Sequence, residues 1–129
     1  MAWNLDNDRP IYAQLVERLQ VQIVSGAYLP GGKLPSVREL AAVAAVNPNT
    51  MQKAFAELEK SGLIITQGTN GRIVTEDERL IQDSKRELAK RQADVYFAGM
   101  EGLGFTRSQA VRFLRETAGK GEAEDESAD

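Results

Sequence analysis

Residues 46–64 read VNPNTMQKAFAELEKSGLI, and this stretch decides the fold of the first half of the chain. Its apolar residues recur at helical spacing and predict one buried face, formed by Met51, Ala54, Phe55 and Leu58. Asn49, Gln52 and Lys53 lie on the opposite side of the same turns. The pattern therefore predicts a helix that packs by one face and presents polar side chains on the other.

The same stretch contains signals for both ends of this helix. Asn47 is a good N-cap and Pro48 suits the first helical position, whereas Ser61 and Gly62 end the pattern, which predicts a helix over 48–60. Two helices are expected before it, over 10–25 and 36–44, separated by the turn-rich connector AYLPGGKLP. The second should begin with a capping box between Ser36 and Glu39.

A β-hairpin is expected directly after the third helix. Two short β-branched runs, over 63–67 and 72–75, flank the turn sequence GTNG, and Asn-Gly is a strong hairpin signal. Three helices followed by a hairpin, with a short turn between the second and third helices, predict a winged helix-turn-helix.

The rest of the chain is expected to be helical. Thr75 and Glu78 have the spacing of a capping box and open a helix to about Ala98, and Thr106 and Gln109 open a last helix. The fold class is mainly α (α+β), with three predicted regions: a winged helix-turn-helix over 1–75, a two-helix dimerisation region over 76–118, and a disordered acidic tail over 119–129.

The composition excludes several classes of function. The 129 residues contain no cysteine and no histidine, so they lack thiolate ligands, the commonest general base and the commonest transition-metal ligand. Neither a metal site nor a cofactor is expected, and the chain is not expected to be an enzyme, because its acids are scattered along helix faces. No apolar run could span a bilayer and the N-terminus does not resemble a signal peptide, which predicts a cytoplasmic protein.

The charge is distributed unevenly along the chain. The net charge is -3, but residues 9–75 hold seven basic residues against four acidic ones. Residues 76–129 hold nine basic residues against thirteen acidic ones. The excess of positive charge therefore lies in the predicted winged helix-turn-helix, which is compatible with a nucleic-acid partner.

The outward residues of the third helix have the chemistry that base recognition needs. Asn49 and Gln52 can each make two hydrogen bonds to adenine, and Lys53 can donate to guanine or phosphate. Asn47 and Thr50, at the helix start, are placed to contact phosphate. Taken singly, such residues more often form a solvated face; it is the whole array, hairpin included, that favours DNA binding.

The array over residues 9–75 resembles the DNA-binding domain of GntR-type bacterial regulators, including the stretch GAYLPGGKLPSVRELA. The resemblance implies that Arg38 contacts DNA, that the third helix is the recognition helix, and that Gly71 is the glycine at the wing tip. Arg72 beside it would supply charge. The DNA-binding residues expected on these grounds are Lys33, Ser36, Arg38, Asn47, Asn49, Thr50, Gln52, Lys53, Gly71 and Arg72.

The two C-terminal helices resemble those of the reduced YtrA-like branch of this family, whose members dimerise through them. Two amphipathic helices cannot enclose a core, so they should pack on a partner. The expected dimerisation residues are Leu80, Ile81, Leu88, Val95, Val111 and Leu114. The alternative is that the residues of the long helix fold back on their own domain.

These observations predict a homodimeric repressor that binds double-stranded DNA at an inverted-repeat operator, and the resemblance implies a bacterial operon, often one for a transporter. Tyr96, Phe97 and Phe113 are candidates for an effector cleft, with a place in the dimer core as the alternative. A winged-helix module that binds proteins without contacting DNA specifically is the competing function.

Overall fold

The computed structural model describes residues 3–119, which divide into two compact units with a boundary after Leu88. The first unit contains α1 (Ile11–Val24), α2 (Val37–Ala44), α3 (Pro48–Ser61), β1 (Ile64–Thr66), β2 (Arg72–Val74) and the first turns of α4 (Glu78–Gly102). The second contains the remainder of α4 and α5 (Arg107–Ala118). The mainly helical fold with a small two-stranded sheet is the predicted class.

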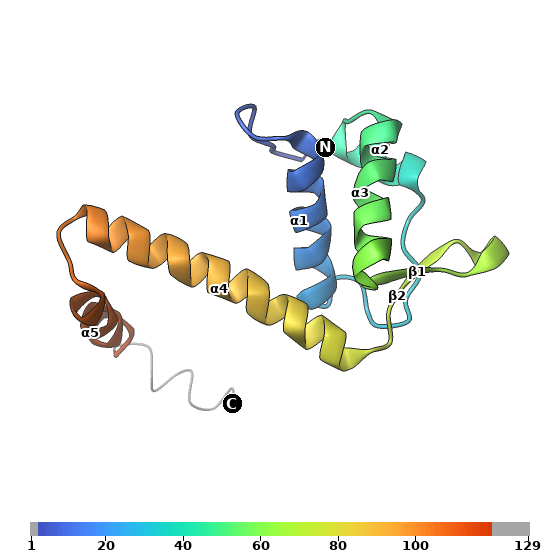
Figure 1. Cartoon of the computed structure of the whole chain (residues 1–129). Coiled ribbons are helices and arrows are strands. Elements are labelled where there is room, and N and C mark those ends of the chain that lie inside the picture. Colours follow the sequence, from blue (N-terminus) through green and yellow to red (C-terminus); the bar gives the residue numbers. More distant parts are fainter. Residues whose placement is uncertain (1–2, 120–129) are drawn as a thin grey trace. The chain divides into compact units, whose positions relative to one another are not determined.

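The core of the first unit is centred on α3, which packs against α1, α2 and β1 (Figure 1). The four apolar residues predicted to be buried on α3 are all 0–1% exposed. From α1 they meet Leu15, Leu19 and Ile23, spaced four residues apart and 0–2% exposed. The helical period of the sequence thus specifies the buried face.

A capping box and a left-handed residue define the two ends of α2. The backbone N–H of Glu39 donates to Ser36 Oγ at 3.1 Å and the Ser36 N–H donates to Glu39 Oε1 at 3.0 Å, which confirms the predicted capping box. At the other end Ala45 adopts φ 59° and ψ 48°. This conformation turns the chain within three residues from α2 into the N-cap of α3.

The predicted hairpin forms as an antiparallel pair in which Ile64 faces Val74 and Thr66 faces Arg72. The strands are shorter than predicted, and a 3₁₀ turn at Gly68–Asn70 joins them. Gly71 has φ 78° and ψ -143°, a combination that favours glycine. Part of the connector after α1 lies along β2, because the N–H of Leu34 donates to the carbonyl of Arg72 at 2.9 Å.

The start of α4 differs from the prediction of a capping box between Thr75 and Glu78. The helix begins at Glu78, and Asp77 Oδ1 accepts from the N–H groups of Arg79 and Leu80 at 3.1 and 3.2 Å. Thr75 is only 4% exposed and its own N–H pairs with the carbonyl of Leu63. It therefore extends the hairpin, which leaves Asp77 to cap the helix.

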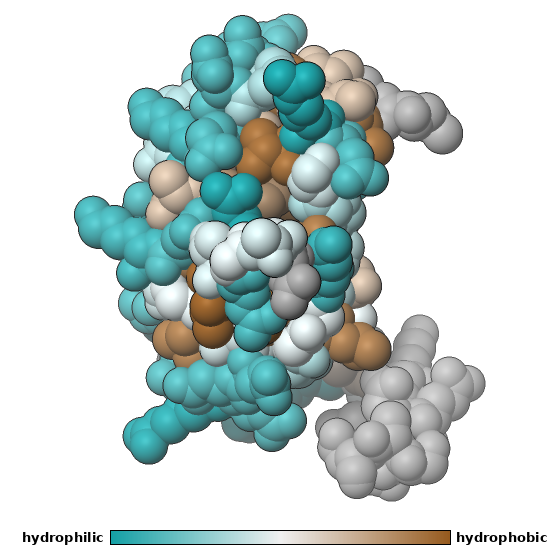
Figure 2. Space-filling view, turned by 90° about the vertical axis from the view of Figure 1, so that its right-hand side faces the viewer, coloured by the Kyte–Doolittle hydropathy of each residue, from teal (hydrophilic) through white to brown (hydrophobic). Residues whose placement is uncertain are grey.

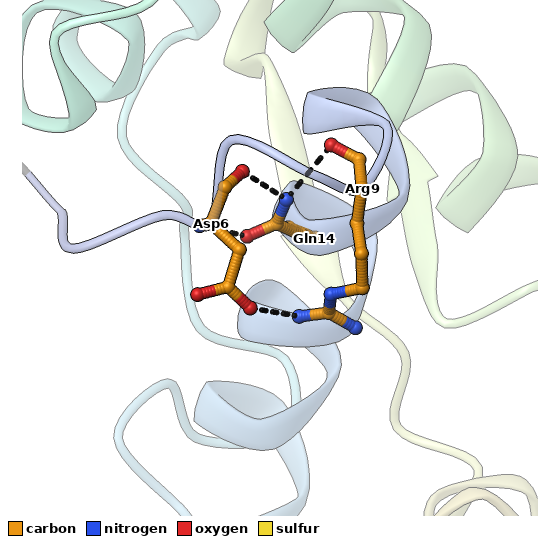
Figure 3. A network of polar contacts seen from close by, with 3 residues as sticks. All are labelled: Asp6, Arg9 and Gln14. Carbon is orange, nitrogen blue, oxygen red and sulfur yellow. Dashed lines mark hydrogen bonds and ion pairs between the residues drawn. The ribbon is translucent and has the colours of Figure 1, made fainter.

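The segment before α1 is held to that helix by Gln14, which is 7% exposed (Figure 3). The side-chain amide of Gln14 donates to the carbonyls of Asp6 and Arg9 at 2.8 and 3.1 Å, and its oxygen accepts from the Asp6 N–H at 2.7 Å. The carboxylate of Asp6 also pairs with Arg9 at 3.2 Å. A single glutamine thus connects the segment that contains Asp6 and Arg9 to α1.

In the second unit α4 continues to Gly102, past its predicted end at Ala98. The Tyr96 hydroxyl donates to the carbonyl of Ala110 at 2.7 Å, which joins α4 to α5. The predicted capping box between Thr106 and Gln109 is confirmed at the start of α5. Residues 120–129 of the predicted acidic tail lie outside the described residues.

Candidate DNA-binding surface

The N-terminal turns of α3 separate polar side chains from the core. Asn47 Oδ1 accepts from the N–H of Asn49 at 2.7 Å, so Asn47 caps the helix as predicted. Asn49, Gln52 and Lys53 are all exposed, whereas Met51 between them is fully buried. Side chains three and four positions apart lie on one helix face, so the three polar residues form a continuous outward surface.

Asn47 and Thr50 lie beside the N-terminal segment. Both line an open hollow at the start of α3, together with Trp3, Leu5 and Asn7. These three N-terminal residues were not predicted for the site, because they precede the first predicted helix and carry no periodic signal. The helix N-terminus contributes partial positive charge here, which suits a phosphate group.

Lys53 is in contact with α1 through an aromatic ring. Its Nζ lies 4.7 Å from the centroid of the Tyr12 ring, within the range of a cation–π interaction. This contact restricts a long, flexible side chain at the edge of the outward surface. Tyr12 lies on α1 and is not among the residues predicted for DNA binding.

The candidate residues on α2 and on the connector before it differ in whether their polar groups are already hydrogen-bonded within the protein. Lys33 and Arg38 are exposed. The Ser36 hydroxyl is engaged by the N–H of Glu39, and the hydrogen bonds that Glu39 receives from the backbone and side chain of Ser36 hold the pKa of Glu39 below its ordinary value. The Ser36 hydroxyl is therefore part of the capping box. Arg38 is exposed on the first turn of α2, which this capping box stabilises.

Lys33 lies close to the wing. A Cβ atom added to Gly71 would come within 3.7 Å of the Lys33 side chain, and Lys33 forms a β-bridge with Ile73. The structure therefore brings Lys33, Gly71 and Arg72 together, although they are far apart in the sequence. Figure 2 shows mostly hydrophilic side chains on the face that carries the hairpin.

Arg72 is held by α3. Its Nε donates to Glu59 Oε1 at 2.7 Å, and its guanidinium carbon lies 5.2 Å from the centroid of the Phe55 ring. The Thr66 hydroxyl donates to the other carboxylate oxygen of Glu59 at 2.8 Å. Burial alone raises the pKa of Glu59, but the hydrogen bonds from Arg72 and Thr66 and the charge of Arg72 outweigh it and lower that pKa.

The residues predicted for dimerisation have different environments. Ile81 is 6% exposed and, with the partly buried Leu80, packs into the core of the first unit. In the second unit Val95 is 74% exposed, and Val111 and Leu114 of α5 are 37% and 46% exposed. The exposed apolar side chains of this set thus lie on the second unit, whereas Ile81 at the start of α4 is buried in the first unit.

The three aromatic residues predicted for an effector cleft form two pairs within the second unit. Tyr96 and Phe97 pack edge to face with ring centroids 5.4 Å apart, whereas Phe113 packs on Phe105 at 5.8 Å. Arg107 lies over the Phe97 ring at 4.2 Å. An open hollow in this unit is lined by Phe113, Phe105, Leu103, Gly104, Gln109, Arg112 and Glu116.

Two features are absent from residues 3–119. Within that range, no helix combines the length and the apolar character that a membrane crossing requires. Among the same residues, no three acidic side chains lie near enough to one another to hold a metal ion.

The sequence of the chain resembles those of known transcriptional regulators. The family model described as "Bacterial regulatory proteins, gntR family" matches residues 11–74. The chain is 31% identical over 109 residues to the uncharacterized HTH-type transcriptional regulator YhcF of Bacillus subtilis, covering 84% of this chain and 90% of that protein. The chain belongs to the GntR family. This GntR protein is also 38% identical over 98 residues to the HTH-type transcriptional repressor YtrA of Bacillus subtilis, covering 71% of the chain and 75% of the repressor.

Solved structures show a likeness in fold as well as in sequence. A GntR family transcriptional regulator from Listeria monocytogenes has 38% identity and a TM-score of 0.78, and the match covers 87% of this chain and 98% of the regulator. The DNA-binding domain of AraR in complex with operator ORX1 matches 58% of this chain and 92% of its own, with 30% identity and a TM-score of 0.50. Family and fold together identify a DNA-binding transcriptional regulator with a winged helix-turn-helix.

Proposed function

We propose that this GntR regulator is a homodimeric repressor that acts in the cytoplasm on an inverted-repeat operator. The observation that carries the proposal is the division of α3 into a buried apolar face and an outward face of Asn49, Gln52 and Lys53. In a helix-turn-helix protein the N-terminal turns of this helix enter the major groove. The relative YtrA is named a transcriptional repressor, which supports repression rather than activation.

The proposed roles follow from the chemistry of each side chain. Asn49, Gln52 and Thr50 read base edges, because amides and hydroxyls can match the donors and acceptors of the major groove. Four cations supply phosphate contacts and the salt dependence of binding: Lys33, Arg38, Lys53 and Arg72. The backbone at Gly71 approaches the DNA at the wing, and Asn47 and Ser36 contribute from the starts of α3 and α2.

Dimerisation is proposed to use the second unit. Val95, Val111 and Leu114 carry the exposed apolar surface there, with Leu88 at the boundary between the units. Leu80 and Ile81, predicted for the same interface, are mainly engaged in the core of their own unit. Two copies joined in this way would present two recognition helices to successive major grooves.

The regulated genes are proposed to form a bacterial operon, with a transporter operon as the first candidate. A small-molecule effector would act by binding more tightly to one arrangement of the dimer's two winged helix-turn-helix units than to another. Its proposed site is the aromatic region of the second unit that includes Tyr96, Phe97 and Phe113. The competing assignment of these rings is the dimer core.

The deciding experiment is selection of bound duplexes from a random DNA pool by the purified protein, with the affinity for the enriched duplex then followed against salt. We expect an inverted repeat with half-sites about one helical turn apart and a steep fall of affinity with salt. Recovery of no enriched sequence, with weak binding to all duplexes, would contradict the proposal and favour a protein-interaction module.

A further inference from the structure

Side chains from both strands of the hairpin meet at Glu59 on the C-terminal half of α3. One carboxylate oxygen accepts from Arg72 Nε on β2, and the other accepts from the Thr66 hydroxyl on β1. Thr66 and Arg72 are directly opposite each other in the hairpin register. Glu59 therefore receives both members of one cross-strand pair and joins the wing to the recognition helix.

Two contacts hold the guanidinium of Arg72 in place. The Nε hydrogen bond to Glu59 is 2.7 Å long, and the fully buried Phe55 ring lies 5.2 Å from the guanidinium carbon. Glu59 thus engages Arg72 through Nε, the nitrogen nearest the side-chain stem. The Arg72 side chain is 25% exposed, and its hydrogen bond to Glu59 uses Nε rather than either of the two terminal amino groups, each of which can donate to a second acceptor.

The charge of Glu59 makes its position unusual for a DNA-binding surface. A carboxylate near the phosphate backbone repels it, so removing one is expected to strengthen binding. Glu57 is a second glutamate on α3, exposed to solvent. A purely electrostatic role would give Glu57 and Glu59 the same sign of effect, whereas a positioning role would give them opposite signs.

We infer that Glu59 is a positioning residue for DNA binding, orienting the Arg72 guanidinium so that its terminal amino groups meet a backbone phosphate beside the wing. The inference rests on the proposed function, which assigns Arg72 a phosphate contact. A bound guanidinium loses less side-chain freedom on contact with DNA than a free one, so orientation before binding increases affinity. The lowered pKa of Glu59 keeps the carboxylate charged at neutral pH.

The test compares Glu59→Ala, Glu57→Ala, Arg72→Ala and the double variant Glu59→Ala/Arg72→Ala. Each is titrated against the duplex enriched from the random pool at several salt concentrations, after circular dichroism has confirmed folding. Arg72→Ala should lower affinity about tenfold and reduce the salt slope by about one unit. Glu57→Ala should raise affinity slightly, whereas Glu59→Ala should lower it several-fold.

The double variant tests whether Glu59 acts through Arg72. With Arg72 absent, Glu59→Ala should no longer weaken binding and should raise affinity slightly, as Glu57→Ala does. Glu59→Gln, which keeps one acceptor oxygen and the side-chain length, should fall between wild type and Glu59→Ala. This variant provides the same comparison if the alanine variant does not fold.

Three results would overturn the inference while leaving sequence-specific DNA binding by the dimer intact, although the third would also remove the phosphate contact proposed for Arg72. They are tighter binding by Glu59→Ala than by wild type, an equal loss from Glu59→Ala in the presence and absence of Arg72, and an unchanged salt slope in Arg72→Ala. Failure of the wild-type protein to enrich any duplex would instead refute the proposed function, and the inference with it.

Discussion

The Nζ of Lys53 lies 4.7 Å from the centroid of the Tyr12 ring, which places a candidate DNA contact of α3 against α1. Its neighbour Gln52 is exposed. The two adjacent residues are therefore expected to contribute differently to DNA binding. Lys53 would contribute charge from a restricted position, and Gln52 would contribute hydrogen bonds to a base.

Substitution of the two residues separates charge from base recognition. Lys53→Ala should weaken binding to all duplexes by a similar factor and reduce the salt slope by about one unit. Gln52→Ala should cost about 1–3 kcal/mol on the enriched duplex and relax the preference at one base pair. Titration of enriched and mixed-sequence duplexes measures both. Equal losses on the two duplexes for Gln52→Ala would contradict its assigned role.

Gln14→Glu should destabilise the protein in a pH-dependent manner. A carboxylate cannot donate to the carbonyls of Asp6 and Arg9, so the expected loss at neutral pH is about 1–3 kcal/mol. Burial beside carbonyl oxygens would raise the folded-state pKa of the new carboxyl group above its unfolded value. Stability should therefore recover as the pH falls through that raised pKa, because the protonated group can donate one hydrogen bond.

Denaturant unfolding at neutral and mildly acidic pH checks this expectation. Gln14→Ala is the control, since it removes all three hydrogen bonds of Gln14 without adding a titrating group. Equal losses in Gln14→Glu and Gln14→Ala at both pH values would contradict the raised pKa of the new carboxyl group, and a negligible loss in Gln14→Ala would show that the hydrogen bonds of Gln14 contribute little.

Ala45→Gly should stabilise the turn of the helix-turn-helix. Ala45 has φ 59°, a left-handed conformation that costs an alanine about 1 kcal/mol and a glycine little. We expect a gain of up to about 0.6 kcal/mol in the free energy of unfolding, because the greater freedom of glycine in the unfolded chain offsets about 0.4–1 kcal/mol of the relieved strain. Ala42→Gly, at an exposed position within α2, should instead lose about 1 kcal/mol. A destabilised Ala45→Gly would contradict the assigned strain.

Glu59 should contribute to the acid sensitivity of folding. Its folded-state pKa lies below the ordinary value, so its stabilising effect is present above the unfolded-state pKa and is lost as pH falls through the lowered folded-state pKa. Glu59→Gln should therefore lose less stability than wild type on acidification below about pH 5. Urea unfolding at several pH values measures the difference. Glu57→Gln is the control, and an acid response of Glu59→Gln identical to that of wild type would rule out this contribution.

Leu114→Lys should separate dimerisation from folding. Leu114 is 46% exposed in the single chain, so a lysine there should be tolerated by the fold and disfavoured at an apolar interface. We expect a smaller sedimenting species and a loss of about 100-fold or more in affinity for the inverted repeat, because two linked half-site contacts are lost. Ser108→Lys, at an exposed position on α5, should change neither quantity.

Local signals predicted most of the elements correctly. The capping boxes at Ser36 and Thr106, the N-cap at Asn47 and the hairpin around GTNG all depend on residues within a few positions of one another. The prediction of a capping box at Thr75 was wrong, although its spacing was equally suitable. The Thr75 backbone pairs with Leu63 and so belongs to the hairpin rather than to the start of α4. The four residues from Thr75 to Glu78 carry no information about a hydrogen-bond partner that lies twelve positions earlier.

The outward face of α3 was likewise predictable, because helical periodicity that buries Met51 and Phe55 necessarily exposes Gln52 and Lys53. The contacts that hold this face could not be predicted from the sequence. Tyr12 lies against Lys53, and the N-terminal segment lines a hollow with Asn47 and Thr50, through contacts that exist only in the folded chain; neither has a partner at a diagnostic spacing. The candidate site was thus predicted by residue type and completed by packing.

The sequence by itself determined the helices, the hairpin, the buried stripe of α3 and the family, because periodicity, capping and turn chemistry act over a few neighbouring residues. Tertiary structure alone decided which polar groups remain available to a partner. Glu59 orients Arg72, Gln14 holds the segment that lines one side of the α3 N-terminus, and Ile81 packs into the core of its own unit. Each result depends on residues brought together from distant positions, whose hydrogen bonds and burial exist only in the folded chain.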